Sequence, residues 1–158
     1  MHVNSNWRIL LLISLVWLGV AGCRTAAPLP VANLKEPGWT VRQGQAVWRR
    51  NRGAPEIAGD ILVATRGNDR AFVQFSKTPL PLVIAQSTPK AWEVETPVQN
   101  KHYSGHGRPP KRLIFLYLPR AILGEPLPGN WLWQPLENNG WHLENRGTGE
   151  SLEGYFTQ

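Results

Sequence analysis

From residue 39 onward, short runs of alternating apolar and polar residues are separated by turn-forming residues, a pattern typical of β-strands. Residues 70–77 are the clearest run, because Val73 and Phe75 fall on one face and Gln74 falls on the other. The short connections between runs predict an antiparallel meander. Strands are expected at residues 45–50, 56–65, 70–77, 82–87, 91–96, 130–134, 141–145 and 151–156.

Two segments interrupt this pattern. Residues 97–111 are mainly polar, so we expect a long loop there. Residues 112–123 are mainly apolar, and we expect a strand that ends at Leu118 and a short helix that opens at Pro119, since proline suits the first helical position. A single helix is disfavoured because it would hold Pro119 in its interior.

The N-terminal segment has a different pattern. Residues 9–22 form an apolar run that is shorter than the roughly 20 residues needed to cross a membrane. The run follows Arg8 and ends in small residues, as cleavable signals do. Its last residues with the following cysteine, Val20-Ala21-Gly22-Cys23, resemble the lipobox of bacterial lipoproteins. That resemblance implies cleavage before Cys23 and attachment of diacylglycerol to its sulfur.

Acylation would place the protein in the cell envelope. One acyl chain binds a membrane reversibly, whereas the two or three of a lipoprotein anchor it stably. Arg24, in place of aspartate, resembles an outer-membrane sorting signal, so we expect the protein on that membrane, facing the periplasm. We expect residues 1–22 to be the signal peptide, residues 23–38 the lipidated cysteine with a flexible tether, and residues 39–158 a single domain. A secretory signal cut elsewhere and an ordinary N-terminal helix are the alternatives.

Composition narrows the partners. The formal net charge is +6, but an anchored protein does not meet nucleic acid, so nucleic acid is not expected as a partner. Cys23 is the only cysteine, so no intramolecular disulfide can form. We also expect a monomer. Tryptophan is abundant after Cys23, and these side chains either fill the core of a sheet or line a groove for a ligand such as a sugar. They are Trp39, Trp48, Trp92, Trp131, Trp133 and Trp141.

Residues 39–45 (WTVRQGQ) followed by Trp48, and residues 118–126 (LPRAILGEP), resemble the first hairpin and the helical crossing of the LolA/LolB-like family of outer-membrane lipoprotein-sorting proteins. The resemblance implies a mainly β fold with a short helix, in which a curved antiparallel sheet forms an incomplete (half) barrel. Its concave face would bind the acyl chains of lipoprotein cargo. The implied lipid-binding face is Phe75, Trp92, Val94, Leu116, Trp131 and Trp133.

The resemblance also assigns a role to Leu80, which lies between Pro79 and Pro81. In this family, a loop at a comparable position projects an apolar residue into the bilayer. The two prolines stiffen the loop and remove ladder donors. Leu80 therefore either engages the membrane or packs over the mouth of the barrel.

A basic stretch lies between Thr96 and Gly124, where the sequence contains no acid. Such a patch attracts anionic lipid headgroups or an acidic protein. The alternative is that the acids of residues 125–158 neutralise it. The basic patch is Lys101, Arg108, Lys111 and Arg112.

Catalysis is not expected. His102 and His106 have no cysteine or carboxylate nearby in the sequence to complete a metal site, and Ser104 lacks the context of a nucleophile. We expect no enzyme activity, cofactor or metal. Two functions remain, namely acyl-chain binding with delivery to the outer membrane, and a structural or assembly lipoprotein that holds a protein, glycan or anionic lipid through the basic patch. An open apolar cavity favours the first and a filled core the second.

Overall fold

The computed structural model of this chain describes residues 28–157, so the predicted signal peptide and Cys23 lie outside the described residues. The described part is mainly β, with nine strands in one antiparallel sheet and one short α-helix. The elements are β1 (Thr40–Arg49), β2 (Glu56–Arg66), β3 (Arg70–Lys77), β4 (Leu80–Ser87), β5 (Ala91–Thr96), the 3-10 turn η1 (Pro97–Gln99), β6 (Lys101–His106), α2 (Ile114–Ile122), β7 (Trp131–Pro135), β8 (Gly140–Asn145) and β9 (Glu150–Thr157).

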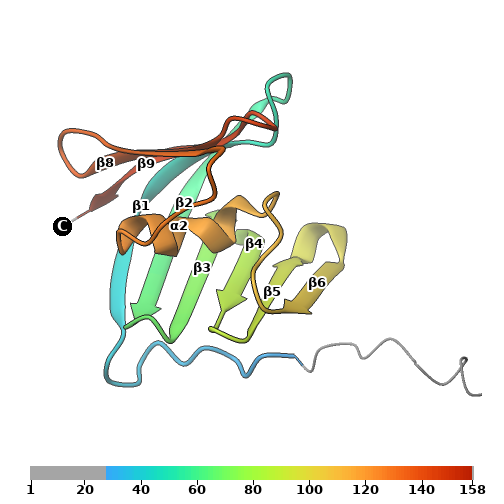
Figure 1. Ribbon diagram of the computed structural model, residues 1–158, viewed down its shortest axis with the longest axis vertical. Helices are drawn as coiled ribbons and strands as arrows, with labels where there is room; N and C mark the ends of the chain where they lie inside the picture. Colours follow the sequence, from blue (N-terminus) through green and yellow to red (C-terminus); the bar gives the residue numbers. More distant parts are fainter. Residues whose placement is uncertain (1–27, 158) are drawn as a thin grey trace, which may run out of the picture.

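The sheet is open and curves around α2 (Figure 1). Its order is β6-β5-β4-β3-β2-β1-β9-β8-β7, so β6 and β7 are the two edges. The chain leaves the β6 edge, crosses the inner face as α2, and returns as three strands that pair with β1 through β9. These last strands fold over the helix from the other side (Figure 1). The prediction of a mainly β, antiparallel, unclosed sheet with a short helix is confirmed.

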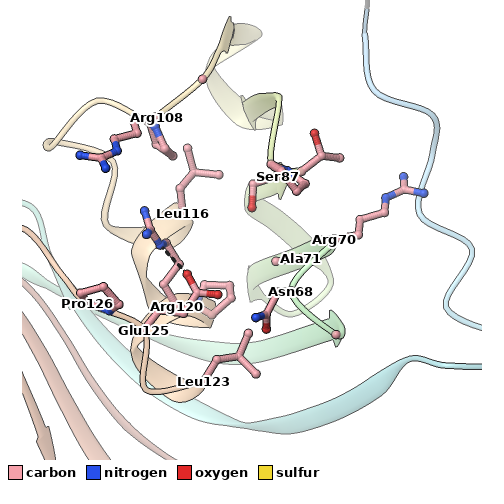
Figure 2. A pocket seen from close by; sticks show the side chains of 16 residues that line it. Asn68, Arg70, Ala71, Ser87, Arg108, Leu116, Arg120, Leu123, Glu125 and Pro126 are labelled. Carbon is pink, nitrogen blue, oxygen red and sulfur yellow. Dashed lines mark hydrogen bonds and ion pairs between the residues drawn. The ribbon is translucent and has the colours of Figure 1, made fainter.

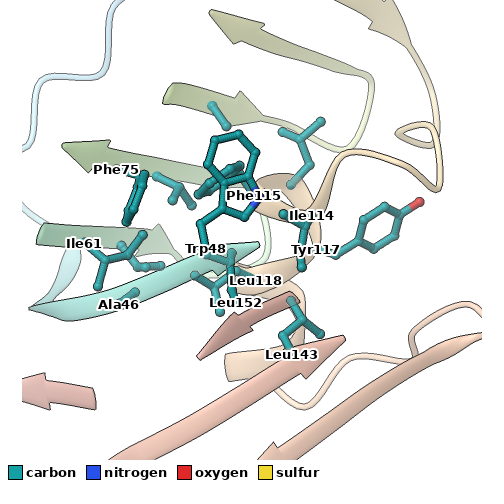
Figure 3. Close-up of a cluster of buried hydrophobic side chains, with 14 of the residues drawn as sticks. Ala46, Trp48, Ile61, Phe75, Ile114, Phe115, Tyr117, Leu118, Leu143 and Leu152 are labelled. Carbon is teal, nitrogen blue, oxygen red and sulfur yellow. The ribbon is translucent and has the colours of Figure 1, made fainter. Parts of the chain in front are cut away.

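The core lies between α2 and the inner face of the sheet. Trp48 of β1, Phe75 of β3 and Phe115 of α2 form an aromatic cluster with ring centroids 5.1 to 6.1 Å apart (Figure 3). Edge and tilted arrangements at this separation are favourable for aromatic rings. The cluster joins both halves of the chain, because β1 is the first strand in the sequence and α2 comes after the sixth.

The helix corrects one prediction. Residues 114–122 form a single helix with Pro119 inside it, not a strand followed by a helix. An interior proline costs about 3 kcal/mol. However, every residue from Ile114 to Pro119 is buried, and burying one large apolar side chain contributes about 1.5–3 kcal/mol, so burial offsets the cost.

The predicted loop at residues 97–111 is also wrong, because residues 101–106 form the edge strand β6. Most of β6 is exposed, so it lacks the apolar alternation that marks a half-buried strand. In the ladder with β5, Gly105 of β6 lies opposite Trp92 of β5. A Cβ at Gly105 would lie 2.6 Å from the indole, so the ring packs directly onto the glycine backbone.

The β3–β4 turn is tighter than predicted. Thr78 and Pro79 form the turn, and β4 begins at Leu80, which pairs with Lys77. Pro81 lies within β4, next to a register shift in the ladder. Proline is tolerated at such irregularities because a ladder donor is already missing there.

Residues 28–39 run along the ends of the strands (Figure 1). The amide of Leu29 donates to Glu93 at 3.0 Å, and Arg66 pairs with Glu36 at 3.3 Å. That the whole of residues 23–38 serves as a flexible tether stays a prediction. Among residues 28–157, no helix is long and apolar enough to cross a membrane.

Candidate functional site

A cavity of about 290 Å³ lies between the start of α2 and the inner face of β4, β5 and β6. We call it the apolar cavity. Its volume lies just below the roughly 300–1,000 Å³ of small-molecule sites. Most of its wall is aliphatic or aromatic. The apolar lining residues are Trp48, Val83, Trp92, Val94, Tyr103, Pro110, Leu113, Ile114 and Phe115.

Local sequence explains this wall. The alternation of β5 turns Trp92, Val94 and Thr96 to the cavity side. The indole of Trp92 lies on Gly105, so the absence of a side chain on β6 positions the largest side chain of this wall. Phe115 closes the cavity from the helix side, where its ring lies 5.1 Å from that of Trp48.

One acid lines this cavity. Glu150, at the start of β9, is only 8% exposed and accepts a hydrogen bond from Trp48 Nε1 at 3.1 Å. Burial raises the pKa of the Glu150 carboxyl to about 7, while the bond from Trp48 and the charge of Arg50 oppose the rise. Nothing in the sequence around residue 150 marks this acid, because its burial depends on pairing with a strand about a hundred residues away.

Two arginines lie at the same cavity. Arg50 follows β1 and Arg112 precedes α2, and both are exposed residues that line it. The guanidinium of Arg50 lies over the ring of Trp48, 5.2 Å from the centroid. The cavity therefore combines an apolar wall, a buried carboxyl and two cationic groups, which can bind and orient an amphiphile.

A second cavity, of about 530 Å³, lies among the β2–β3 and β4–β5 turns, the loop after β6 and the later part of α2 (Figure 2). Arg120 pairs there with Glu125 at 2.9 Å. The Arg70 side chain points away from this cavity, toward residues 28–39, and donates to the carbonyl of Pro30 (Figure 2). Most charged side chains of the second cavity therefore already have a partner within the protein.

The residues of the implied lipid-binding face are not brought together. Trp92 and Val94 line the apolar cavity, and Leu116 lines the second cavity. Phe75 is fully buried in the core. The remaining two residues lie on the edge strand β7, which six other strands separate from β5 in the sheet. There Trp131 packs on Tyr117, and Trp133 stacks on Trp141.

The basic patch also divides between the two cavities. Arg112 lines the apolar cavity and Arg108 lines the second cavity. Lys101 is exposed at the start of β6, and Lys111 is exposed between β6 and α2. Within residues 28–157, none of the four forms an ion pair. Of the acids in residues 125–158, only Glu125 pairs with a base of the preceding stretch.

Leu80 is 57% exposed at the start of β4, and Val98 in η1 is 62% exposed. The pairing of Ile84 with Glu95 carries the start of β4 toward η1, so the two apolar side chains lie at one end of the sheet. Gln99 of η1 also lines the apolar cavity, so the cavity reaches the same end. In the described part of the chain, no cluster of side chains fits a metal ion.

No protein-family model matches this chain, and no curated protein matches its sequence.

Proposed function

We propose that the protein is a lipid-anchored, LolA/LolB-like acyl-chain-binding lipoprotein that delivers acylated cargo at the outer membrane. The observation that carries the proposal is the apolar cavity between α2 and the inner face of an open, curved sheet. Trp92, Val94 and Phe115 of this cavity would remove part of the surface of an alkyl chain from water. Cys23 would supply the anchor.

The capacity of the site follows from the packing of α2. The helix already covers Phe75 and contacts Trp48, so most of the inner face is occupied by the protein itself. The β4–β6 side keeps the apolar cavity, with a volume of about 290 Å³. We therefore assign one acyl chain to the apolar cavity.

The end of the sheet that holds Leu80 and Val98 would face the bilayer. Both side chains are exposed, although burial would lower the free energy of each. Lys77 and Lys101 lie at the same end, and each cation near an anionic membrane contributes about 1 kcal/mol. An acyl chain would then pass between the membrane and the apolar cavity over a short distance.

Filling the apolar cavity tests this function. In the full chain carrying Cys23→Ala, Leu113→Trp places an indole at the cavity wall. We expect it to weaken binding of the neutral probe N-phenyl-1-naphthylamine by at least about ten-fold, a loss near 1.4 kcal/mol. Probe fluorescence during titration gives the affinity.

The matched control is Ile122→Trp, at the other end of the same helix and outside the apolar cavity. It should bind the probe like the parent chain. Equal binding by both variants would show that the probe, and by extension an acyl chain, lies elsewhere.

A second candidate function is a structural or assembly lipoprotein. The unpaired charges of Lys101, Lys111 and Arg112 and the open edge of β6 favour it, since an acidic extended segment could add to this edge. Photo-crosslinking from position 103 on β6 in intact cells tests it. A discrete protein adduct that Lys101→Glu abolishes is the expected result, and no adduct contradicts this candidate.

A further inference from the structure

Some arginines of this protein are neutralised by a neighbouring acid. Arg49 pairs with Glu56 at 2.6 Å, and Arg120, which lines the second cavity, pairs with Glu125 at 2.9 Å. Among the described residues, neither Arg50 nor Arg112 has a carboxylate within 4.0 Å. The cavity therefore carries two uncompensated guanidinium groups that come from separate elements.

The position of Arg50 is restricted by its neighbour. Its guanidinium lies 5.2 Å from the ring centroid of Trp48, a cation–π arrangement. Arg112 is the second residue before α2, in the loop whose Pro110 and Leu113 also line the cavity. A guanidinium presents a planar fork of donors that matches carboxylate and phosphate oxygens.

Glu150 does not compensate these charges directly. Its carboxyl is buried, accepts a hydrogen bond from Trp48 Nε1, and forms no ion pair with Arg50 or Arg112. A neutral alkyl chain would leave both arginines without a partner, whereas an anionic head would supply one. Because the cavity volume of about 290 Å³ is small for a ligand site, we assign it a single chain.

We infer that the apolar cavity takes a single-chain amphiphile, with its alkyl chain against Trp92 and Val94 and its anionic head held by Arg50 and Arg112. This inference rests on the proposed function, because it assumes an alkyl chain in the cavity. The shared ligand chemistry is one chain with a carboxylate or a phosphate monoester. A free fatty acid supplies the first head and a monoalkyl phosphate the second.

Displacement of N-phenyl-1-naphthylamine from the full Cys23→Ala chain tests the inference. Dodecanoic acid, dodecyl phosphate and dodecanol have the same chain and differ only in their heads. At about pH 6.5, where both acids are ionised and Glu150 is largely protonated, we expect at least one anion to displace the probe about ten-fold better than the alcohol. The stronger of the two anions identifies the head.

In Arg50→Gln/Arg112→Gln, the anions should fall to the affinity of dodecanol while dodecanol is unchanged. Lys111→Gln, an exposed neighbour that does not line the cavity, is the control and should keep the preference. Circular dichroism verifies folding.

The outcomes separate the two proposals. If the alcohol binds as well as both anions, or if the double variant keeps the preference, the anionic head is wrong while chain binding stands. If neither the probe nor any of the three amphiphiles binds the parent chain, the proposed function fails, and this inference fails with it.

Discussion

At the residue scale, Glu150 has the most unusual environment. A carboxyl that is 8% exposed loses most of its hydration, and the single hydrogen bond from Trp48 replaces only part of it. Its folded-state pKa of about 7 lies above the ordinary value of 4.5. The folded state thus binds a proton that the unfolded state has released, so this carboxyl makes stability fall as pH rises from about 4.5 to about 7.

We predict that Glu150→Gln removes this pH dependence. The amide oxygen still accepts from Trp48, but nothing ionises. Relative to the wild type, the variant should be similarly stable at about pH 4.5 and up to about 3 kcal/mol more stable at about pH 8. Urea unfolding at the two pH values measures both. Equal pH slopes for the two proteins would show that Glu150 ionises normally.

At the element scale, the β5–β6 hairpin and α2 provide most of the wall of the apolar cavity, and β6 and the start of α2 differ from what the sequence predicted. The alternation in residues 70–77 predicted β3 correctly because one face of that strand is buried. Strand β6 was missed because exposure leaves an edge strand no apolar period. A short helix was expected in this region, but its start was placed at Pro119 and not at Ile114, because burial overrides the local effect of the proline.

The candidate site was predictable only in part. The alternation of β5 correctly turned Trp92 and Val94 inward, where both line the apolar cavity. Glu150 and Arg50 could not be found, because the chain separation between Glu150 and Trp48 is 102 residues and only the pairing of β1 with β9 brings them together.

We predict that Gly105→Ala disturbs this hairpin. The new methyl would lie 2.6 Å from the indole of Trp92, so the ring must move. Overpacking of this kind costs about 1–3 kcal/mol. Gly129→Ala is the control, because a Cβ there meets nothing within 4 Å, and it should change stability by less than about 0.5 kcal/mol. Denaturant unfolding compares the two, and equal losses would contradict the packing of Trp92 on Gly105.

At the scale of the whole molecule, the curved sheet is filled unevenly. The helix packs an aromatic core against the sheet, and the β4–β6 side keeps the apolar cavity. On the β7–β9 side, a separate cavity is lined by Ile122, Trp133, Trp141 and Phe156. The exposed Leu80 and Val98 lie at the end of the sheet that this cavity reaches. An apolar cavity that reaches an end of the sheet with exposed apolar side chains is the arrangement that the proposed carrier requires.

The central claim is that the apolar cavity holds one acyl chain, and native mass spectrometry of the Cys23→Ala chain tests it most directly. The account predicts that the purified protein carries one single-chain lipid, or takes up one dodecanoate after delipidation, and that Leu113→Trp loses this adduct while Ile122→Trp retains it. A bare mass that persists in the presence of dodecanoate would contradict the account.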